Sequence, residues 1–275
     1  MDRYCVMGNP IEHSRSPWIQ NRFAVLMGHS LQYEKRLVPL DGFAQAVAAF
    51  RAEGGLGCNI TVPFKFEAAA LADHLLPRAQ LAGASNFLHF RDGGIHADNT
   101  DGAGLVNDIQ NNAGVALAGR DVLLIGAGGA SAGVLGPLIA AQPRRITVAN
   151  RTLGKAEALV ARHAALAQAH GVLVDSAELA AVQTPYHVVV NATASSLSGA
   201  GVPVQPSVLQ AGALALDMMY GPAAAGFMDW ARAHGAIARD GLGMLVEQAA
   251  EGFLLWRGVR PPSAQVLAEL RATLG

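Results

Sequence analysis

A glycine-rich turn is the stretch of this sequence best suited to binding a charged ligand. Gly126 and Gly128 follow the aliphatic run 122–125, which is typical of a buried parallel strand, and a helix is expected from about Ala130. Glycine adopts backbone angles closed to other residues and lets the main chain approach a pyrophosphate, which then lies on the free N–H groups of the helix. This order predicts a dinucleotide site at Gly126, Ala127, Gly128, Gly129 and Ala130.

The end of the next predicted strand, 146–149, indicates which dinucleotide binds. About 20 residues after the glycines, an NAD-binding unit usually carries Asp or Glu against the ribose 2′-hydroxyl. Asn150, Arg151 and Thr152 stand there instead, and Lys155 follows one helical turn later. A guanidinium can stack on the adenine and pair with a 2′-phosphate, which a carboxylate would repel. The turn therefore predicts NADP, although each cation alone could be an ordinary exposed residue.

Polar side chains also follow the predicted strands of the first half of the chain. They are Ser14, Ser16, Asn59, Thr61, Lys65, Asn86 and Asp101. Open α/β sheets bind ligands at the carboxyl ends of their strands. Hydroxyls, amides, one ammonium and one carboxylate suit a small polyol that carries a carboxylate, and Lys65 with Asp101 could handle a proton.

Each of these residues also has a structural alternative. Ser14 or Ser16 could cap the helix expected from Pro17, and Asp101 could cap the helix after it. Asn59 and Thr61 could simply end a strand, and Lys65 could be solvated. Their joint position beside a nucleotide-binding unit favours the substrate site.

The order of expected elements predicts an α/β protein of two domains. Strands are expected at 4–7, 31–38, 57–61, 86–90 and 95–97, and again at 122–125, 146–149, 171–174, 187–191 and 214–217. We expect an N-terminal α/β substrate domain over 1–103 and a Rossmann-like NADP-binding domain over 104–242. The C-terminal helices, over 243–275, are expected to return to the first domain and complete it.

Bulk composition excludes several classes of protein. With 51% hydrophobic and 15% charged residues among 275, the chain has material for a core and no composition typical of disorder. A net charge of −1 provides no long-range field for nucleic acid or an anionic membrane. No leader-like segment and no apolar run approaching 18 residues is present, so a soluble, cytoplasmic protein is expected.

Cysteines and histidines give no pattern for a metal. Cys5 and Cys58 lie in separate apolar runs and are expected to be buried thiols. No two histidines have the i, i+4 spacing of a helical metal site, and His163 and His170 are expected at the surface. We therefore predict no metal site.

Along nearly its whole length the chain resembles the shikimate dehydrogenase family. The matching motifs are residues 8–17, 59–65, 99–102, 126–131, 150–152, 191–193, 217–220 and 240–245, with Gln248. The resemblance implies NADPH-dependent reduction of 3-dehydroshikimate to shikimate, the fourth step toward chorismate and the aromatic amino acids. Ser85 and Phe87 in place of the usual Val and Thr, and Ala225-Gly226 after Tyr220, depart from the family pattern, and Ser131 stands where the general dinucleotide fingerprint has a third glycine.

The resemblance also implies a role for each matching residue. Ser14 and Ser16 would bind the substrate carboxylate, and Lys65 with Asp101 would be the catalytic pair. The remaining substrate contacts would come from Asn59, Thr61, Asn86, Tyr220 and Gln248. Residues 126–130 would bind the pyrophosphate, and Asn150, Arg151, Thr152 and Lys155 the 2′-phosphate and adenine. The nicotinamide side would be formed by Thr193, Met218 and Gly241.

Three alternatives stay open at this point. A quinate and shikimate dehydrogenase with broader cofactor use would share most of these motifs, although Arg151 argues against a preference for NAD. A non-catalytic NADP-sensing module would be favoured if Lys65 or Asp101 were missing, and both are present. A methylenetetrahydrofolate dehydrogenase would leave the two serines without a ligand. We expect a small-molecule substrate as partner, with no nucleic acid or membrane, and either a monomer or a homodimer.

Overall fold

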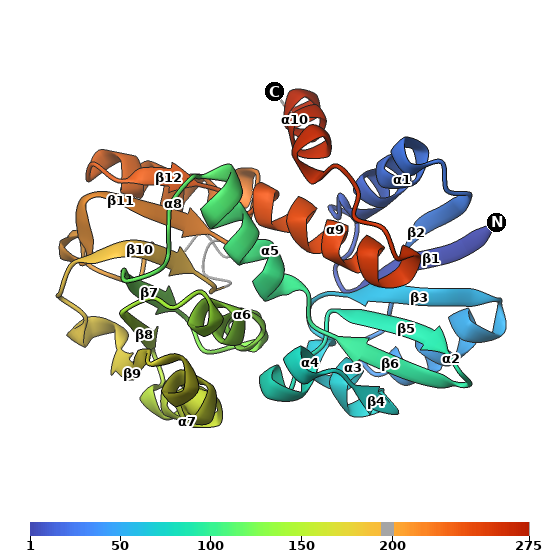
Figure 1. Ribbon diagram of the computed structural model, residues 1–275, viewed down its shortest axis with the longest axis horizontal. Coiled ribbons are helices and arrows are strands. Elements are labelled where there is room, and N and C mark those ends of the chain that lie inside the picture. The colour runs from blue at the N-terminus through green and yellow to red at the C-terminus, as the bar shows by residue number, and fades with distance from the viewer. Residues whose placement is uncertain (194–200, 275) are drawn as a thin grey trace. The chain divides into compact units, whose positions relative to one another are not determined.

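The computed structural model describes residues 1–193 and 201–274 and divides the chain into two compact units. The first comprises Met1–Gly104 and Leu245–Gly275, and the second comprises Leu105–Met244. Each unit has its own six-stranded sheet (Figure 1). The predicted α/β class is therefore confirmed.

The first unit is built on a mixed sheet. Its strands are β1 (Asp2–Gly8), β2 (Leu31–Leu37), β3 (Gly55–Ile60), β4 (His74–Leu75), β5 (Phe87–Arg91) and β6 (Gly94–Asp98). Its helices are α1 (Ser16–Met27), α2 (Phe43–Ala52), α3 (Lys65–Leu71), α4 (Pro77–Ala82), α10 (Ser263–Leu274) and most of α9 (Leu242–Arg257). The strand order is β2-β1-β3-β5-β6-β4, with β5 antiparallel to both β3 and β6.

Both faces of this first sheet are apolar because both are covered. Side chains alternate along a strand, so Cys5 and Met7 of β1 lie in a core cluster with residues of α2 and α3. Tyr4 and Val6 point to the opposite face, where they pack in a cluster with Trp256 of α9. The sheet is therefore a central layer between two layers of helices.

The second unit contains a sheet in which every strand pairing is parallel. Its elements are β7 (Asp121–Ile125), α6 (Gly129–Ala140), β8 (Arg145–Asn150), α7 (Leu153–His170), β9 (Leu173–Glu178), β10 (Tyr186–Asn191), β11 (Leu209–Asp217), α8 (Pro222–Ala233) and β12 (Ile237–Arg239). The order β12-β11-β10-β7-β8-β9 is that of the doubly wound dinucleotide-binding fold. The order reverses between β7 and β10, which is where such sheets bind nucleotides.

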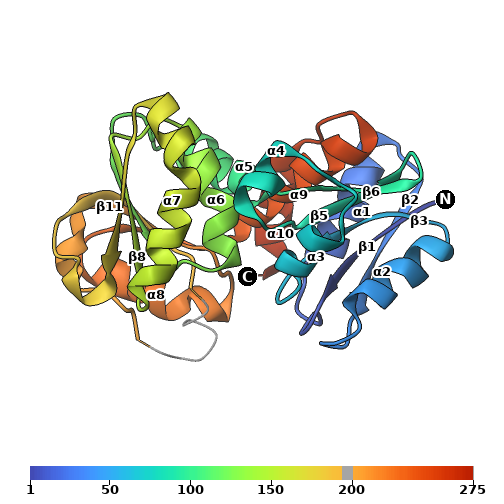
Figure 2. The ribbon, with the colours of Figure 1, turned by 90° about the horizontal axis from the view of Figure 1, so that it is seen from below.

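Two helices pass from one unit to the other. The unit boundaries, at Gly104 and at Leu245, lie inside α5 (Asp101–Asn107) and α9. Within the second unit, α7 contacts α6, β8 and β9, while α8 contacts β11 and β12 (Figure 2). The aliphatic run expected as a buried strand is buried as predicted, since the residues from Val122 to Ile125 are all 0% exposed.

Two local expectations were tested with different outcomes. Cys5 and Cys58 are free, fully buried thiols, as predicted, and face each other in register on β1 and β3. The surface position expected for His163 was wrong, because this residue is completely buried. It lies on the side of α7 that also buries Leu159 and Ala167, and its Nδ1 is 2.9 Å from the carbonyl oxygen of Leu159.

The described residues contain no helix that is long and apolar enough to span a membrane. Over residues 1–193 and 201–274, no group of three or more metal-ligating side chains is placed to hold a metal ion.

Candidate active site

The topology of the first sheet collects the predicted polar residues at one edge. β1 and β3 are parallel, so the loops that follow them leave the sheet at the same edge. β5 runs antiparallel to β3, which puts Asn86, just before β5, at that edge, and β6 returns there with Asp101 shortly after it. Residues far apart in sequence thus converge on one side of the sheet.

Close backbone packing holds the first two loops together. The N–H of Asn9 donates to the carbonyl of Val62 at 2.9 Å, and the N–H of Thr61 donates to the carbonyl of Met7 at 3.0 Å. Gly8 makes this approach possible, because a Cβ at this position would lie only 2.3 Å from Cγ2 of Thr61. The loop that leads to the two serines is therefore fixed against the loop that leads to Lys65 at the start of α3.

The two serines stand at the start of α1. The Ser14 hydroxyl accepts the backbone N–H of Ser16 at 3.3 Å, so Ser14 does help to close the helix start, as one alternative proposed. Ser16 is buried and is the first residue of the helix, and the N-cap residue, Arg15, makes no side-chain capping bond. Among the described residues, no acceptor receives the hydroxyl hydrogen of Ser14, which leaves this donor for a ligand.

Lys65 and Asp101 form an ion pair. Lys65 Nζ lies 2.6 Å from Asp101 Oδ2, and the two side chains are 17% and 7% exposed. The other carboxylate oxygen, Oδ1, accepts a hydrogen bond from the Asn86 amide at 2.8 Å. Asp101 opens α5, but its carboxylate is directed to these two side chains. The pair therefore offers a fixed ammonium donor that is only partly open to water.

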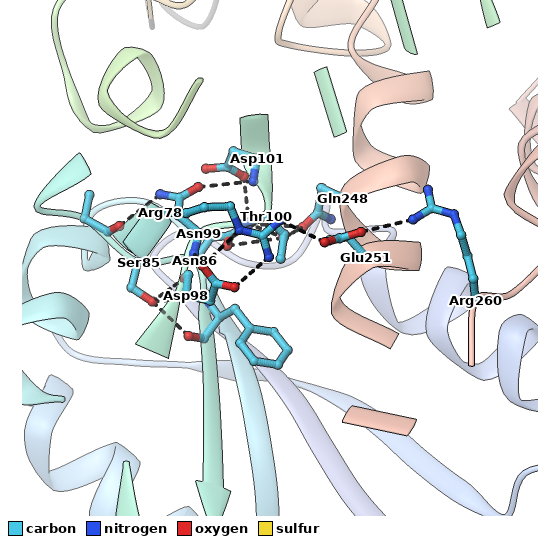
Figure 3. Close-up of polar contacts among 12 residues, drawn as sticks. Arg78, Ser85, Asn86, Asp98, Asn99, Thr100, Asp101, Gln248, Glu251 and Arg260 are labelled. Atoms are coloured by element: carbon cyan, nitrogen blue, oxygen red, sulfur yellow. Dashed lines mark hydrogen bonds and ion pairs between the residues drawn. The ribbon is translucent and has the colours of Figure 1, made fainter. Parts of the chain in front are cut away.

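Asn86 connects three elements around this pair (Figure 3). Its Oδ1 accepts the backbone N–H of Thr100 at 2.8 Å, and its amide nitrogen lies 2.9 Å from Thr100 Oγ1 and 3.2 Å from Gln248 Oε1. Gln248 comes from α9 and donates through Nε2 to the carbonyl of Leu245. Asn86, which directly precedes β5, thus links that strand to the start of α5 and to α9.

Asn59, on the neighbouring strand β3, holds Asn86 in place. Its Oδ1 accepts the hydroxyl of Tyr33 at 2.7 Å, and its Nδ2 donates to the backbone carbonyl of Asn86 at 3.1 Å. Burial raises the pKa of the Tyr33 phenol well above its usual value, so the hydroxyl remains a donor. Asn59 therefore fixes Asn86 in place, and its own contact with substrate stays a prediction.

The second unit carries the predicted glycine turn. Gly126 has φ +108°, a conformation that favours glycine, and its N–H donates to the carbonyl of Ala149 at 2.7 Å. A Cβ on Gly128 would meet no atom of the described residues within 4 Å, so packing against them does not require this glycine, and it leaves room for a ligand. Ser131, at the third glycine position, is fully buried, so a small residue suffices there.

The basic turn after β8 has the character of an anion site. Arg151 and Lys155 are exposed, and neither side chain makes a hydrogen bond or ion pair with any described residue. Asn150 donates through Nδ2 to the carbonyl of Thr152 at 2.9 Å, which shapes the turn. Two cations whose side chains have no described partner, at the predicted ribose position and with glycines at the predicted pyrophosphate position, fit a dinucleotide that bears a 2′-phosphate.

The predicted nicotinamide-side residues lie on a connected set of loops. The hydroxyl of Thr193 donates to Asn191 Oδ1 at 2.7 Å, and Asn191 donates in turn to Asp217 Oδ2 at 3.0 Å. Gly241 donates to the carbonyl of Met219 at 2.8 Å and approaches Met218 so closely that a Cβ would lie 2.3 Å from its carbonyl oxygen. The ends of β10, β11 and β12 are therefore held together.

Sequence comparison covers both units. Residues 6–88 match the family described as "Shikimate dehydrogenase substrate binding domain", residues 108–198 match "Shikimate / quinate 5-dehydrogenase", and residues 241–271 match "Shikimate 5'-dehydrogenase C-terminal domain". The shikimate dehydrogenase (NADP(+)) of Paracidovorax citrulli is 66% identical over 274 residues, which are 99% of this chain and 98% of that protein. The chain belongs to the shikimate dehydrogenase family.

Other relatives extend the family assignment to solved structures. A shikimate dehydrogenase (NADP(+)) from Acidovorax sp. is 67% identical over 99% of this chain and 97% of its own length. The Ael1 enzyme from Pseudomonas putida has a TM-score of 0.90 at 44% identity, covering 98% of each chain. Shikimate 5-dehydrogenase from Thermus thermophilus, solved with NADP(H) and shikimate, has a TM-score of 0.86 at 29% identity over 100% of both chains.

Most of the predicted substrate-side residues of this shikimate dehydrogenase family member lie in its first unit. These are Ser14, Ser16, Asn59, Thr61, Lys65, Asn86, Asp101 and Gln248, whereas Tyr220 lies in the second unit with all of the predicted cofactor residues. The structure adds five residues to which sequence reasoning assigned no role. They are Tyr33, Arg78, Asp98, Asn99 and Thr100. Asn99 and Thr100 adjoin Asp101 in the same motif, which was the available signal; Tyr33 and Arg78 gave none.

Proposed function

We propose that this protein catalyses the reversible NADPH-dependent reduction of 3-dehydroshikimate to shikimate, a step toward chorismate and the aromatic amino acids. The observation that carries the proposal is the Lys65–Asp101 ion pair, held by Asn86 at the edge of the first sheet. The side chains of Arg151 and Lys155, which have no partner in the described part of the chain, support NADP. The name of the curated relatives, shikimate dehydrogenase (NADP(+)), agrees with both the proposed substrate and the proposed cofactor.

The proposed mechanism uses the chain's own residues for the proton. NADPH, when bound, supplies the hydride that reduces the ketone carbon. The carbonyl oxygen then needs a proton, and Lys65 Nζ is the donor that we assign to it. Asp101 orients that ammonium from 2.6 Å and is itself oriented by Asn86. In the oxidation of shikimate, Lys65 takes the proton back from the hydroxyl.

The remaining substrate-side residues are assigned by their chemistry. Ser14 and Ser16 would donate hydroxyls to the substrate carboxylate, and Ser14 has a hydroxyl hydrogen to give. Thr61 and Tyr220 supply further hydroxyls for the ring, and Gln248 supplies an amide. Asn59 would contribute chiefly by holding Asn86, because both ends of its amide already have protein partners.

An initial-rate assay tests the activity. Purified protein is mixed with shikimate and either NADP or NAD, then with quinate, and the absorbance of the reduced nicotinamide is followed. Rapid reduction with shikimate and NADP alone is expected. Comparable rates with quinate or NAD would instead support a quinate and shikimate dehydrogenase with broader cofactor use. No absorbance change with any pair would support a non-catalytic NADP sensor.

A growth assay tests the pathway. A bacterium that lacks its own shikimate dehydrogenase should grow without added aromatic amino acids when it expresses this chain. Failure to grow, with the activity present in the purified protein, would contradict the biosynthetic role and leave the reaction itself intact.

A further inference from the structure

The segment that leads from β6 to Asp101 is held at every residue. Asn99 donates through Nδ2 to the carbonyl of Ala84 at 3.0 Å and accepts the backbone N–H of Asp101 on its Oδ1 at 3.1 Å. Thr100 is held by Asn86, as described above. Asp98 is the first residue of the segment, so what fixes Asp98 also fixes the path to Asp101.

Arg78 of α4 grips Asp98 with two parallel hydrogen bonds. Its Nε lies 3.1 Å from Oδ1 and its Nη2 lies 2.6 Å from Oδ2, which is the two-pronged geometry that favours arginine over lysine. Asp98 is only 1% exposed, and its Oδ1 also accepts the backbone N–H of Asn99 at 2.7 Å. No other cation contacts this buried carboxylate within the described ranges.

The third guanidinium nitrogen reaches a different element. Arg78 Nη1 lies 2.8 Å from Glu251 Oε1 on α9, three residues after Gln248 and on the same side of that helix (Figure 3). Glu251 is held in turn by Arg260 at 3.0 Å, and Arg260 also pairs with Glu247 at 2.9 Å. Arg78 thus joins α4, the end of β6 and the Gln248 side of α9.

Charge strengthens this arrangement. Burial alone would favour loss of the Arg78 proton, but the contacts with Asp98 and Glu251 outweigh it and raise the pKa of the guanidinium above its usual value. Removing the cation would leave the Asp98 carboxylate buried and unpaired, so the segment would have to move to reach water.

We propose that Arg78 is a positioning residue of the reaction: through Asp98 it fixes Asp101, and through Glu251 it fixes Gln248. This inference rests on the proposed function, because it takes Asp101 as part of the catalytic pair and Gln248 as a substrate contact. Arg78 itself touches neither substrate nor cofactor in this account.

The two arms predict different kinetic effects. Arg78→Met should lower kcat by up to about 10²-fold, the scale of loss caused by a displacement of about 1 Å in a catalytic group. Arg78→Lys should recover part of kcat, because an ammonium keeps the charge but cannot form the two-pronged contact. Glu251→Gln, which weakens only the α9 arm, should chiefly raise the KM for shikimate. Arg91→Met, at an exposed arginine on β5, is the matched control and should match the wild type.

A double variant separates positioning from simple stabilisation. Arg78→Met combined with Asp98→Asn removes the uncompensated buried charge, so its Tm should rise toward that of the wild type. Its kcat should stay low, because the end of β6 is no longer tied to α4. If kcat instead recovers together with Tm, Arg78 only stabilises the fold and the proposal is overturned.

Wild-type rates with shikimate and NADP are measured first. An inactive wild type would overturn the proposed function and this assignment with it. An active wild type, with Arg78→Lys and Arg78→Met both at the wild-type kcat, would overturn this inference alone. If Arg78→Met does not fold, Arg78→Lys decides alone. A kcat below that of the wild type supports the inference, and a wild-type kcat overturns it.

Discussion

The two candidate sites achieve selectivity in opposite ways. In the first unit the polar groups are buried and paired with one another: Asn86 contacts Thr100, Asp101 and Gln248, and Asp101 contacts Lys65. In the second unit the cations Arg151 and Lys155 are exposed, and their side chains have no partner among the described residues, while Gly128 leaves space in the preceding glycine turn. In the proposed function, substrate chemistry would rely on groups already held in position, whereas selection of NADP would rely on charges that the described part of the protein leaves unpaired.

The largest expected effect comes from breaking the paired site at its proton donor. Lys65→Ala should lower kcat by about 10²-fold or more, because the acid–base group is lost. Steady-state rates with shikimate and NADP measure this, and Tm shows whether the fold survives. A variant that folds and keeps near-normal kcat would remove Lys65 from the mechanism.

Breaking the unpaired site should alter cofactor choice and leave chemistry intact. Arg151→Ala should raise the KM for NADP by about 10- to 100-fold, since a hydrogen bond to a charged group contributes about 1.5–3 kcal/mol. The KM for NAD, which lacks the 2′-phosphate, should not change. Arg162→Ala removes the same charge further along α7 and should leave both values as they are. Equal losses for NADP and NAD would contradict a contact with the phosphate.

The glycine turn of the second unit can be tested through the stability of the fold. Gly126→Ala should destabilise the fold by about 1–3 kcal/mol, the cost of a side chain in a strained backbone region. Gly126 has φ +108°, and the new Cβ would lie 3.1 Å from Thr193 Cγ2. Gly226→Ala, inside α8, where the added Cβ would meet no described atom within 4 Å, should instead stabilise the fold by about 0.5–1 kcal/mol. Urea unfolding measures both, and equal effects would refute the backbone argument.

A smaller effect is expected from the buried His163 of the second unit. Burial lowers the pKa of this imidazole below its usual 6.5, so below that pH the unfolded chain takes up a proton more readily than the folded one. The free energy of unfolding should therefore fall below pH 6.5, by at most about 1.4 kcal/mol per pH unit for this group. Unfolding of wild type and His163→Leu should differ in this slope, and identical slopes would contradict the account.

Much of the fold could be predicted because its signals are local. The aliphatic run before Gly126 predicts a buried strand followed by a turn. In the structure, α6 begins at Gly129, one residue from the expected start. Lys65 and Asp101, 36 residues apart, could be paired from the rule that strand ends share one edge of a sheet. The role of each predicted site residue remains a prediction.

Contacts that depend on tertiary register could not be predicted. Arg78 lies on a six-residue helix with little periodicity, and its partner Glu251 is 173 positions away. Tyr33 on β2 contacts Asn59 on β3 across β1, and this contact follows from the order of the three strands in the sheet. His163 was misplaced because its polar type was weighed above its spacing. It is four residues from each of Leu159 and Ala167, which marks it as part of the buried face of α7.

The most direct test of the division between the two sites is NADPH binding to Lys65→Ala, titrated by nicotinamide fluorescence on the same preparation used for kcat. We expect the wild-type Kd together with the loss of turnover, because the lysine belongs to the paired site alone. A Kd that weakens in proportion to the loss of kcat would show that Lys65 serves cofactor binding, and would contradict the account.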